Sequence, residues 1–504
     1  MSAQSSSLLT AGHKVLIANR GEIACRVIRA CREMGLPTVA VYSDADARSA
    51  HVWMADEAVR VGPPPSAESY LLGDRILAAA AKTGATLIHP GYGFLSENAG
   101  FREACDEAGI LFAGPKAYAM RQMGIKTLAR DTMRAAGVPV VPGSDGPIAG
   151  PAEAEAFARD FGLPVMLKAA AGGGGKGMRL VDELSEVGPA FEAAQREARA
   201  YFGDDAVYIE KAIVKPRHIE VQVLADGHGN TIHVFDRECS VQRRNQKVIE
   251  ESPAPHLSDA TRQAMGAVAV KAAEAVDYIG AGTIEFLVDA NEDFYFLEMN
   301  TRLQVEHPVT EMVTGVDLVV EMLRIAMGEP MSVSQDGIQQ RGHAIECRVY
   351  AEDPSRNFMP SPGTLSVYRP PYGPGIRVDD GVVEGSEIPR FYDPMIAKIS
   401  TWAEDRGRCI ERMKATLEAT EIGGIAHNVP YLLWLLEAED FVAGRYDTGI
   451  IARLGEFTDE VIDDDLALAV AVLLEHRKAT AGRPTNGAGE STWSQASRLG
   501  IVRG

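Results

Sequence analysis

The chain has 504 residues and a formal net charge of −20 at pH 7. This charge argues against a nucleic-acid groove or an anionic membrane as the main partner, because both would repel it. The apolar run at residues 466–474 is far shorter than the roughly 20 residues of a membrane span. Hydrophobic residues make up 46% and charged residues 24%, which is ordinary for a soluble globular protein. The length is too great for one core and predicts about two to four domains.

The cysteines and the N-terminus predict a cytoplasmic protein. The chain has six cysteines and no C-x-x-C pair, so zinc and thioredoxin-like chemistry are not expected. So few cysteines in so long a chain fit a reducing cytosol. Residues 1–12 contain no basic residue, and we therefore expect neither a secretory signal nor a transit peptide.

The first segment alternates strand and helix. Strands are expected at 13–18, 38–42 and 86–90, and a helix with one apolar face at 21–34. This order predicts a doubly wound α/β start. Residues 19–22, Asn-Arg-Gly-Glu, do not match G-x-G-x-x-G, so a dinucleotide site is not supported.

A second segment opens near residue 125 and mixes helices with strands. We expect helices at 152–161 and 258–276. Strands are expected at 164–168, 207–211, 218–224, 231–235, 282–288 and 294–300.

A third segment, from about residue 341, is rich in glycine, proline and short strands and contains a helix near 404–419. In the tail we expect one helix at 465–478, followed by a disordered Gly/Ser/Thr/Ala-rich end. The predicted domains are 1–124, 125–340, 341–458 and a tail at 459–504, and the predicted fold class is α/β, α+β overall.

The glycine run in residues 169–177 follows a predicted strand directly. Gly172, Gly173, Gly174 and Gly175 let backbone N–H groups approach an anion closely, and Lys168 and Lys176 add positive charge. Gly177 stands where a Walker A loop has Ser or Thr. The loop therefore predicts a phosphate-covering flap, with a flexible linker as the alternative.

The adjacent predicted strands 282–288 and 294–300 carry Glu285, Glu298 and Asn300. Carboxylate and amide oxygens suit Mg²⁺, which takes few protein ligands and keeps phosphate oxygens in its shell. Solvated acids on a strand pair are the alternative, but both strands are strongly apolar.

The segment 294–308 continues past this strand with further polar groups. Glu298, Asn300 and Arg302 project to one side if the strand extends that far. Burying them without partners would cost on the order of 2–7 kcal/mol for each polar group and more for a charge. Glu306 lies four residues after Arg302. A metal, a phosphate or a small anion would supply the partners, and a salt-bridged strand end is the alternative.

Residues 242–247, Gln-Arg-Arg-Asn-Gln-Lys, concentrate three cations with amides. Such a cluster can stabilise charge that develops on a transferring phosphoryl group, although a solvated loop would look the same. His218, Lys126 and Arg348 are each weak signals in isolation.

Taken together, these motifs resemble the biotin carboxylase family of the ATP-grasp superfamily, over residues 13–455. The most specific pieces are the tetraglycine loop and the segments at 89–98, 237–247, 298–311 and 343–353. The resemblance implies an ATP-grasp fold with an N-terminal doubly wound α/β domain, a mobile glycine-rich lid at about 140–212 and a C-terminal β-rich domain.

The resemblance also implies a reaction. In this family bicarbonate attacks the γ-phosphate of ATP to give carboxyphosphate and ADP. Carboxyphosphate yields CO₂ and phosphate, phosphate takes the N1′ proton of biotin, and the ureido enolate attacks CO₂. The implied cofactors are ATP, Mg²⁺ or Mn²⁺, bicarbonate and biotin on a separate carrier protein.

Roles follow from the resemblance residue by residue. The ATP phosphates and the lid would involve Lys126, Lys168, Gly172, Gly173, Gly174 and Gly175. The nucleotide side would be lined by Glu210, Lys211, His218 and Gln242. The metal would be held by Glu285 and Glu298, with Asn300 nearby. Bicarbonate would be positioned by Lys247, Arg302, Gln304 and Val305. Glu306 would be the general base, and Arg348 would stabilise the biotin enolate oxygen.

Two departures and one absence accompany the resemblance. Ile125 stands where the family usually has Asp or Ser, and Asn245 where some members have His. The carrier's Met-Lys-Met turn is not present, because Met413-Lys414 is followed by Ala415 within a predicted helix. We therefore expect biotin carboxyl carrier and carboxyltransferase subunits as partners, and a homodimer.

The favoured interpretation is the biotin carboxylase subunit of an acyl-CoA carboxylase, acting on acetyl-CoA or propionyl-CoA. A split pyruvate carboxylase is the first alternative. Another ATP-grasp ligase would lack Arg302 to Glu306 together with Arg348. A non-catalytic scaffold would have lost one of Glu298, Arg302, Glu306 or Lys247, and all four are present.

Overall fold

The structure is a computed structural model that describes residues 12–169, 178–202, 205–458 and 472–473. The chain divides into two units, Met1–Phe457 and Thr458–Gly504. The tetraglycine residues Gly172 to Gly175, and all but two residues of the expected tail helix 465–478, lie outside the described residues.

The N-terminal region is the doubly wound α/β layer that the sequence predicts. Its parallel sheet has the order β3-β2-β1-β4-β5. The strands are β1 (Val15–Ile17), β2 (Thr38–Ser43), β3 (Glu57–Gly62), β4 (Leu87–His89) and β5 (Leu111–Phe112), and the helices are α2 (Gly21–Glu33), α3 (Ala50–Met54), α4 (Gly73–Thr83) and α5 (Ala99–Glu107). The central strands β1 and β4 are fully buried, as expected when helices cover both faces of a parallel sheet.

The largest sheet is antiparallel and has the order β13-β12-β9-β10-β11-β14-β21-β19. Its strands are β9 (Arg217–Ala225), β10 (Thr231–Arg243), β11 (Gln246–Ser252), β12 (Gly280–Val288), β13 (Phe294–Asn300), β14 (His343–Tyr350), β19 (Ile376–Asp380) and β21 (Met395–Ala403). The sheet runs without a break across the predicted boundary at residues 340 and 341, because β11 pairs with β14. One surface is therefore shared by the second and third segments of the chain.

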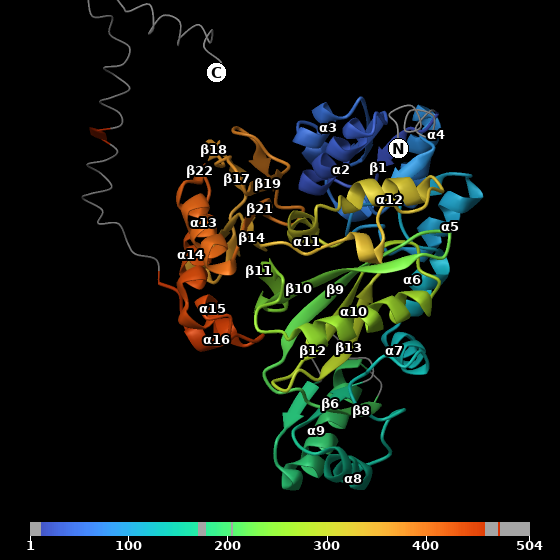
Figure 1. Cartoon of the computed structure of the whole chain (residues 1–504), viewed down its shortest axis with the longest axis vertical. Helices are drawn as coiled ribbons and strands as arrows, with labels where there is room; N and C mark the ends of the chain where they lie inside the picture. The colour runs from blue at the N-terminus through green and yellow to red at the C-terminus, as the bar shows by residue number, and fades with distance from the viewer. Residues whose placement is uncertain (1–11, 170–177, 203–204, 459–471, 474–504) are drawn as a thin grey trace, which may run out of the picture. The chain divides into compact units, whose positions relative to one another are not determined.

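Three helices position the site along this sheet. The long helix α10 (Asp259–Glu274) packs against β9 and β10. The short helix α11 (His307–Thr314) contacts β10, β11, β14 and β21, and α12 (Leu318–Ala326) contacts β12 and α2. Figure 1 shows α11 beside β14 and β21.

A small sheet, β7-β6-β8, forms the region predicted as the lid. It consists of β6 (Val165–Ala169), β7 (Met178–Val181) and β8 (Val207–Lys211), covered by α8 (Pro151–Phe161) and α9 (Leu184–Phe202). The side chains of Val165, Leu167, Phe191 and Ile209 form its own apolar core. The helices α6 (Ala117–Gly124) and α7 (Lys126–Ala135) precede it in the chain.

The remaining C-terminal elements surround the other edge of the large sheet. The helices are α13 (Arg406–Glu418), α14 (Val429–Glu437), α15 (Glu439–Val442) and α16 (Ile450–Leu454), and the short strands are β15 (Glu352–Asp353), β16 (Met359–Pro360), β17 (Gly363–Thr364), β18 (Val367–Arg369), β20 (Glu387–Ile388) and β22 (Glu421–Gly423). Leu432, Leu435 and Phe441 anchor this region in a core with β14 and β21. Among the described residues, no helix is both long and apolar enough to cross a membrane.

The expected strand at 231–235 proved too short, because β10 runs on to Arg243. Its second half, which contains Arg237 and Glu238, is polar in sequence yet buried. The strand turns at Arg244 and Asn245, both in the left-handed region with φ of 52° and 65°. Residues 242–247 are thus the tight end of the β10–β11 hairpin rather than a loose loop, and the asparagine at this tip suits that backbone.

Candidate active site

Two acidic residues face each other on the outer pair of strands. The register of β12 and β13 places Glu285 opposite Glu298, and Thr283 opposite Asn300. Among the described residues, Glu285 binds protein partners, whereas no hydrogen bond or ion pair is recorded for the Glu298 side chain. Within the same described ranges, the buried Asn300 Nδ2 also lacks a hydrogen-bond partner.

This arrangement fits a divalent cation. Burial and the nearby charge of Glu285 raise the pKa of Glu298, although Lys126, His218 and Lys247 oppose the shift. Paired hard oxygen donors that repel one another in the absence of a cation are the donor set that Mg²⁺ or Mn²⁺ prefers. The predicted metal residues Glu285, Glu298 and Asn300 therefore lie together.

Lys247 is the centre of the site. It lies at the start of β11, and its Nζ is 2.6 Å from Glu220 Oε2, 3.0 Å from Glu285 Oε1 and 2.6 Å from Glu306 Oε1. Burial alone would lower the pKa of Lys247, but the surrounding carboxylates hold it well above its usual value. The lysine is thus a buried cation shared by Glu220, Glu285 and Glu306.

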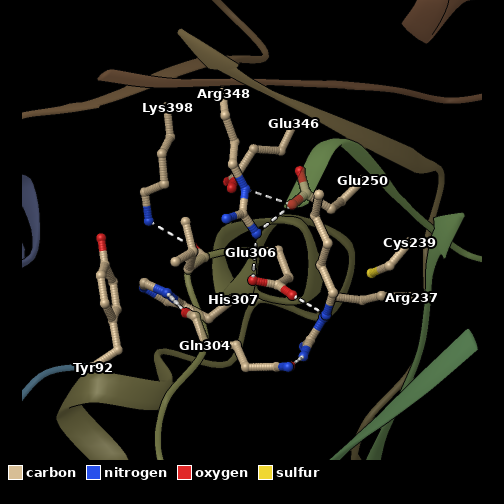
Figure 2. A network of polar contacts seen from close by, with 12 residues as sticks. Tyr92, Arg237, Cys239, Glu250, Gln304, Glu306, His307, Glu346, Arg348 and Lys398 are labelled. Carbon is tan, nitrogen blue, oxygen red and sulfur yellow. Dashed lines mark hydrogen bonds and ion pairs between the residues drawn. The ribbon is translucent and has the colours of Figure 1, made fainter. Parts of the chain in front are cut away.

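Glu306 is the residue before α11, and only 2% of its surface is exposed. Its second oxygen, Oε2, accepts a hydrogen bond from Arg348 Nη2 at 3.0 Å. Figure 2 shows the Glu306 carboxylate between the side chains of Arg348 and Arg237. Burial opposes ionisation, yet Lys247, Arg348 and Arg237 keep the pKa of Glu306 well below its ordinary value. The group is thus a buried carboxylate that remains ionised at neutral pH.

Arg237 on β10 connects this strand with β9, with α11 and with Gln304. Its guanidinium is fully buried and donates to Gln222 at 2.7 Å, to Thr310 at 2.9 Å and to Gln304 at 2.5 Å. Gln304 Nε2 in turn donates to Glu285 Oε1 at 2.8 Å. Because these acceptors satisfy the donors of the buried guanidinium, Arg237 holds the surrounding residues of the site in fixed positions.

Arg302 lies just past the end of β13, which stops at Asn300. Its Nη2 donates to Asn300 Oδ1 at 2.8 Å and its Nε to Glu97 Oε2 at 3.0 Å. Glu97 belongs to the predicted motif at 89–98, so two distant motifs meet at this guanidinium. The carbonyl of Val305 accepts from Lys398 Nζ at 2.6 Å, which fixes the turn between Gln304 and Glu306.

The nucleotide-side residues form a second group. Gln242 Nε2 lies 2.9 Å from His218 Nδ1, and His218 Nε2 lies 3.1 Å from Glu285 Oε2. Burial would lower the pKa of His218, but Glu285 raises it. These contacts connect the predicted nucleotide residues with the metal-type carboxylates.

Lys168 and Glu210 pair between β6 and β8, and Arg130 Nη1 also binds Glu210 Oε1 at 2.6 Å. Lys211 follows on β8 and is half-buried, while Lys126 begins α7 and is exposed. Lys126 still contributes to the electrostatics of Glu298. The glycines Gly172 to Gly175 lie outside the described residues.

Sequence reasoning missed six residues that hold this network, namely Glu97, Glu220, Arg237, Glu250, Glu346 and Lys398. A signal for two of them was present. In β9, His218, Glu220 and Gln222 alternate with Ile219, Val221 and Val223, and in β14, Glu346 and Arg348 stand two apart. Because side chains two apart share a face, this alternation predicts a polar stripe inside a buried sheet.

The facing carboxylates of β12 and β13, the small sheet that bears Lys168 and the arginine held just past the end of β13 fit an ATP-grasp ligase. Family models agree with this class. Residues 11–120 match the biotin carboxylase N-terminal domain, 126–334 match the carbamoyl-phosphate synthase L chain ATP-binding domain, and 346–453 match the biotin carboxylase C-terminal domain.

Individual relatives are similar over most of the chain. The biotin carboxylase of Nostoc is 53% identical and is covered to 99% by 88% of this chain. The propionyl-CoA carboxylase alpha chain of Ruegeria pomeroyi is 52% identical, and the match covers 88% of this chain and 68% of the relative. The solved biotin carboxylase domain dimer of Hydrogenobacter thermophilus 2-oxoglutarate carboxylase, a complex with MgADP, ADP and bicarbonate, is 47% identical with a TM-score of 0.79, and the match covers 87% of this chain and 97% of that one. The chain belongs to the biotin carboxylase family.

Proposed function

We propose that this chain carboxylates biotin with bicarbonate in an ATP-dependent reaction, as the first half-reaction of an acyl-CoA carboxylase. The observation that carries the proposal is the position of Glu306. Its carboxylate is held ionised between Lys247 and Arg348, and Lys247 also contacts Glu285 of the metal-type pair. These contacts support a single network in which Glu306 would be the base, Lys247 would help to bind the anion and Glu285 would belong to the phosphate-metal site.

The metal-nucleotide part would use the carboxylates of β12 and β13. Glu285 and Glu298, with Asn300 nearby, would hold Mg²⁺ or Mn²⁺, which would neutralise charge on the phosphate oxygens. Lys126 and Lys168 would contact the phosphates, and residues Gly172 to Gly175 would cover them. On the nucleotide side we assign Glu210, Lys211, His218 and Gln242. The relative from Hydrogenobacter thermophilus, a complex with MgADP, supports this assignment.

The bicarbonate part would use the turn after β13. Arg302 and Lys247 would bind the anion, while Gln304 and the backbone of Val305 would orient it. Glu306 would take the proton of bicarbonate as its oxygen attacks the γ-phosphorus. The bond from that phosphorus to the β-phosphate oxygen breaks, which gives ADP and carboxyphosphate.

The biotin part would use Arg348. Carboxyphosphate breaks at its carboxyl carbon to give CO₂ and phosphate, and phosphate takes the N1′ proton of biotin. The freed electron pair of N1′ then bonds to CO₂. Arg348 would face the ureido oxygen, where negative charge builds up during this proton transfer.

We further propose a separate biotin carboxyl carrier and carboxyltransferase subunits as partners, and a homodimer. Lys414 stands in the segment that most resembles the biotin-accepting turn of a carrier. It lies within the helix α13, beside Glu411 and Glu437, and not in a turn. A cytoplasmic setting is supported by six unpaired, buried cysteines. We also propose domains at 1–124, 125–340 with a lid at about 140–212, and 341–458, followed by a tail at 459–504. The family matches at 11–120, 126–334 and 346–453 support the division into the first three.

The test is bicarbonate-dependent ADP release with and without free biotin. We expect release to require bicarbonate and a divalent cation and to rise when biotin is added. A protein that releases no ADP under these conditions contradicts the proposal and favours a scaffold. Co-purification with a biotinylated partner, followed by assays with acetyl-CoA, propionyl-CoA and pyruvate, separates an acyl-CoA carboxylase from a split pyruvate carboxylase.

A further inference from the structure

Behind Arg348 lies a second pair of carboxylates, to which the proposed function gives no task. Glu250 on β11 and Glu346 on β14 are both fully buried, with 0% exposure. The register of the two strands places them directly opposite each other. Side chains at opposite positions of an antiparallel pair start from Cβ atoms roughly 4.5–5.5 Å apart, so the two carboxylates share one environment.

Among the described residues, only one oxygen of each carboxylate has a hydrogen-bond partner. Glu250 Oε1 accepts from Arg348 Nε at 2.6 Å, and Glu346 Oε2 accepts from Ser400 Oγ at 2.9 Å. The other two oxygens, Glu250 Oε2 and Glu346 Oε1, are buried without a hydrogen-bond partner among the described residues. In the part of the chain that the structure describes, Arg348 is the one cation that binds a carboxylate of the pair, and it also binds Glu306.

Charged and titratable groups from the neighbouring elements surround Arg348, Lys398 and the carboxylate pair. Figure 2 shows most of them around Arg348. They are Lys247 at the start of β11, Cys239 on β10, Lys398 on β21, Glu306 and His307 at α11, Glu22 on α2, and Tyr92, Tyr350 and Asp393 beside Arg348. Lys398 Nζ donates a hydrogen bond to Val305 O at 2.6 Å and forms an ion pair with Glu22 Oε1 at 3.4 Å.

Two buried carboxylates with so little neutralisation do not both ionise at neutral pH. Burial, together with repulsion from Glu306, raises the pKa of Glu250 to about 7 although Arg348 opposes the shift. Burial and the charge of Glu250 raise the pKa of Glu346 to about 8 although Lys398 opposes it. Like charges that are crowded in this way titrate as a pair and retain a proton.

We infer that Glu250 and Glu346 together hold one proton, and that this proton keeps Arg348 in the position that biotin carboxylation needs. The inference rests on the proposed function, because it concerns the arginine that would face the biotin oxygen. Both glutamates are positioning residues, since they act through Arg348.

The reason is a balance of charge on the Arg348 guanidinium. With one proton on the pair, Glu250 and Glu306 each attract the guanidinium with one negative charge, from the two sides at which they bind it. Loss of the proton adds a second negative charge on the strand side. Arg348 is then drawn towards β11 and β14, and less of its positive charge faces the biotin oxygen, whereas the ATP-cleaving groups keep their contacts.

The experiment compares two rates in one protein, bicarbonate-dependent ADP release without biotin and the additional release that biotin causes. We expect the ratio of the second to the first to be constant near neutral pH. Above about pH 8 it should fall about tenfold for each pH unit, as for loss of a single required proton. Measurements between about pH 6.5 and about pH 9.5 cover this range.

The variants Glu346→Gln and Glu250→Gln each leave a single carboxylate in the pair, which carries its negative charge throughout the alkaline part of this range, above about pH 8. We expect the ratio in both variants to stay within about twofold between about pH 8 and about pH 9.5, where the wild-type ratio falls, because the pair has no further proton to lose there. Glu321→Gln is the matched control. Glu321 is a buried carboxylate on α12 that binds Ser332, so its variant should show the same alkaline fall as the wild type.

Several results would overturn the inference. These are a wild-type ratio that does not fall at alkaline pH, a fall that persists in Glu346→Gln, or a loss that is equal in both rates and independent of pH. Absence of any biotin-stimulated release in the wild type would instead refute the proposed function. If neither variant folds, infrared difference spectra of the wild type decide. A C=O band of a protonated carboxyl group should be present at about pH 7 and should disappear by about pH 9. If no such band is present at about pH 7, the shared proton is contradicted.

Discussion

Arg302 and Glu97 form an ion pair of 3.0 Å that joins the end of β13 to the loop after β4. The same carboxylate accepts the backbone N–H of Thr301 at 3.0 Å through its other oxygen. Glu97 therefore fixes both the side chain of Arg302 and the backbone that carries it. An arginine held in this way can receive an anion without first losing rotamer freedom.

Replacing Glu97 by Gln should raise the bicarbonate KM about three- to tenfold, with a smaller effect on kcat, since the pair is partly exposed and screened by solvent. Steady-state assays with varied bicarbonate check this. The matched control is Glu103→Gln, which breaks an exposed pair with Arg121 in the same region and should leave the KM unchanged. A fall in kcat alone would contradict a positioning role for Glu97.

Replacing Glu298 by Gln should separate metal affinity from stability. The described part of the chain offers this carboxylate no hydrogen-bond or ion-pair partner, and Glu285 repels it, so we expect the metal-free variant to be as stable as the wild type or slightly more stable. The Mg²⁺ concentration for half-maximal ATP cleavage should rise about tenfold, as a ligand charge is lost. Thermal unfolding with and without Mg²⁺ measures both effects. A destabilised metal-free variant with unchanged Mg²⁺ dependence would show that Glu298 is structural.

Replacing Glu306 by Gln should lower bicarbonate-dependent turnover by about 10²–10⁴-fold, the usual contribution of a general base. Nucleotide binding should survive, because the metal-type pair is untouched. Binding of ADP by calorimetry together with ADP-release assays tests this. Turnover close to that of the wild type would refute the base assignment.

Replacing Arg348 by Ser should impair biotin carboxylation more than ATP cleavage. The guanidinium touches Glu250 and Glu306 but has no recorded contact with Glu285 or Glu298 in the described residues. Parallel measurement of carboxybiotin and ADP gives the coupling ratio, which we expect to fall at least tenfold if charge on the biotin oxygen is stabilised here. Equal losses in both products would indicate a structural role.

Glu251 predicts how stability depends on pH. It is buried on β11 and bound by Arg406 at 2.7 Å and by His343 and Tyr446. Burial opposes ionisation, but His343 and Arg406 lower the pKa of Glu251 to about 2. Because the folded pKa lies below the unfolded value, its contribution is fully present above about pH 5 and is lost as the pH falls towards about 2.

This contribution is on the order of 3 kcal/mol. Glu251→Gln should therefore be less stable than the wild type at pH about 7 and should lose less stability on acidification. Urea unfolding at several pH values is the measurement. Parallel curves for the two proteins would contradict the assignment.

Much of the fold follows from local sequence. The strands 207–211 and 294–300 are found where their apolar patterns predict them, and helix 258–276 differs from α10 by no more than two residues at either end. These elements carry their own periodicity and caps, such as the Ser258 side chain that accepts from Thr261 N. The buried half of β10 was missed because charged residues such as Arg237 and Glu238 are normally exposed, and only partners from other strands allow them to be buried.

The sequence by itself determined which chemistry the chain carries, because Glu285, Glu298, Arg302 and Glu306 stand in short motifs whose residue types and spacing are local properties. Only the tertiary structure decided the charge that these side chains carry. Lys247 meets Glu306 across 59 residues and Arg348 meets it across 42, so the charge on Glu306 depends on strands that pair at long range. Likewise, Glu250 and Glu346 are unremarkable in sequence, and they become a carboxylate pair only because β11 lies beside β14 in one register, in an interior where water cannot screen them.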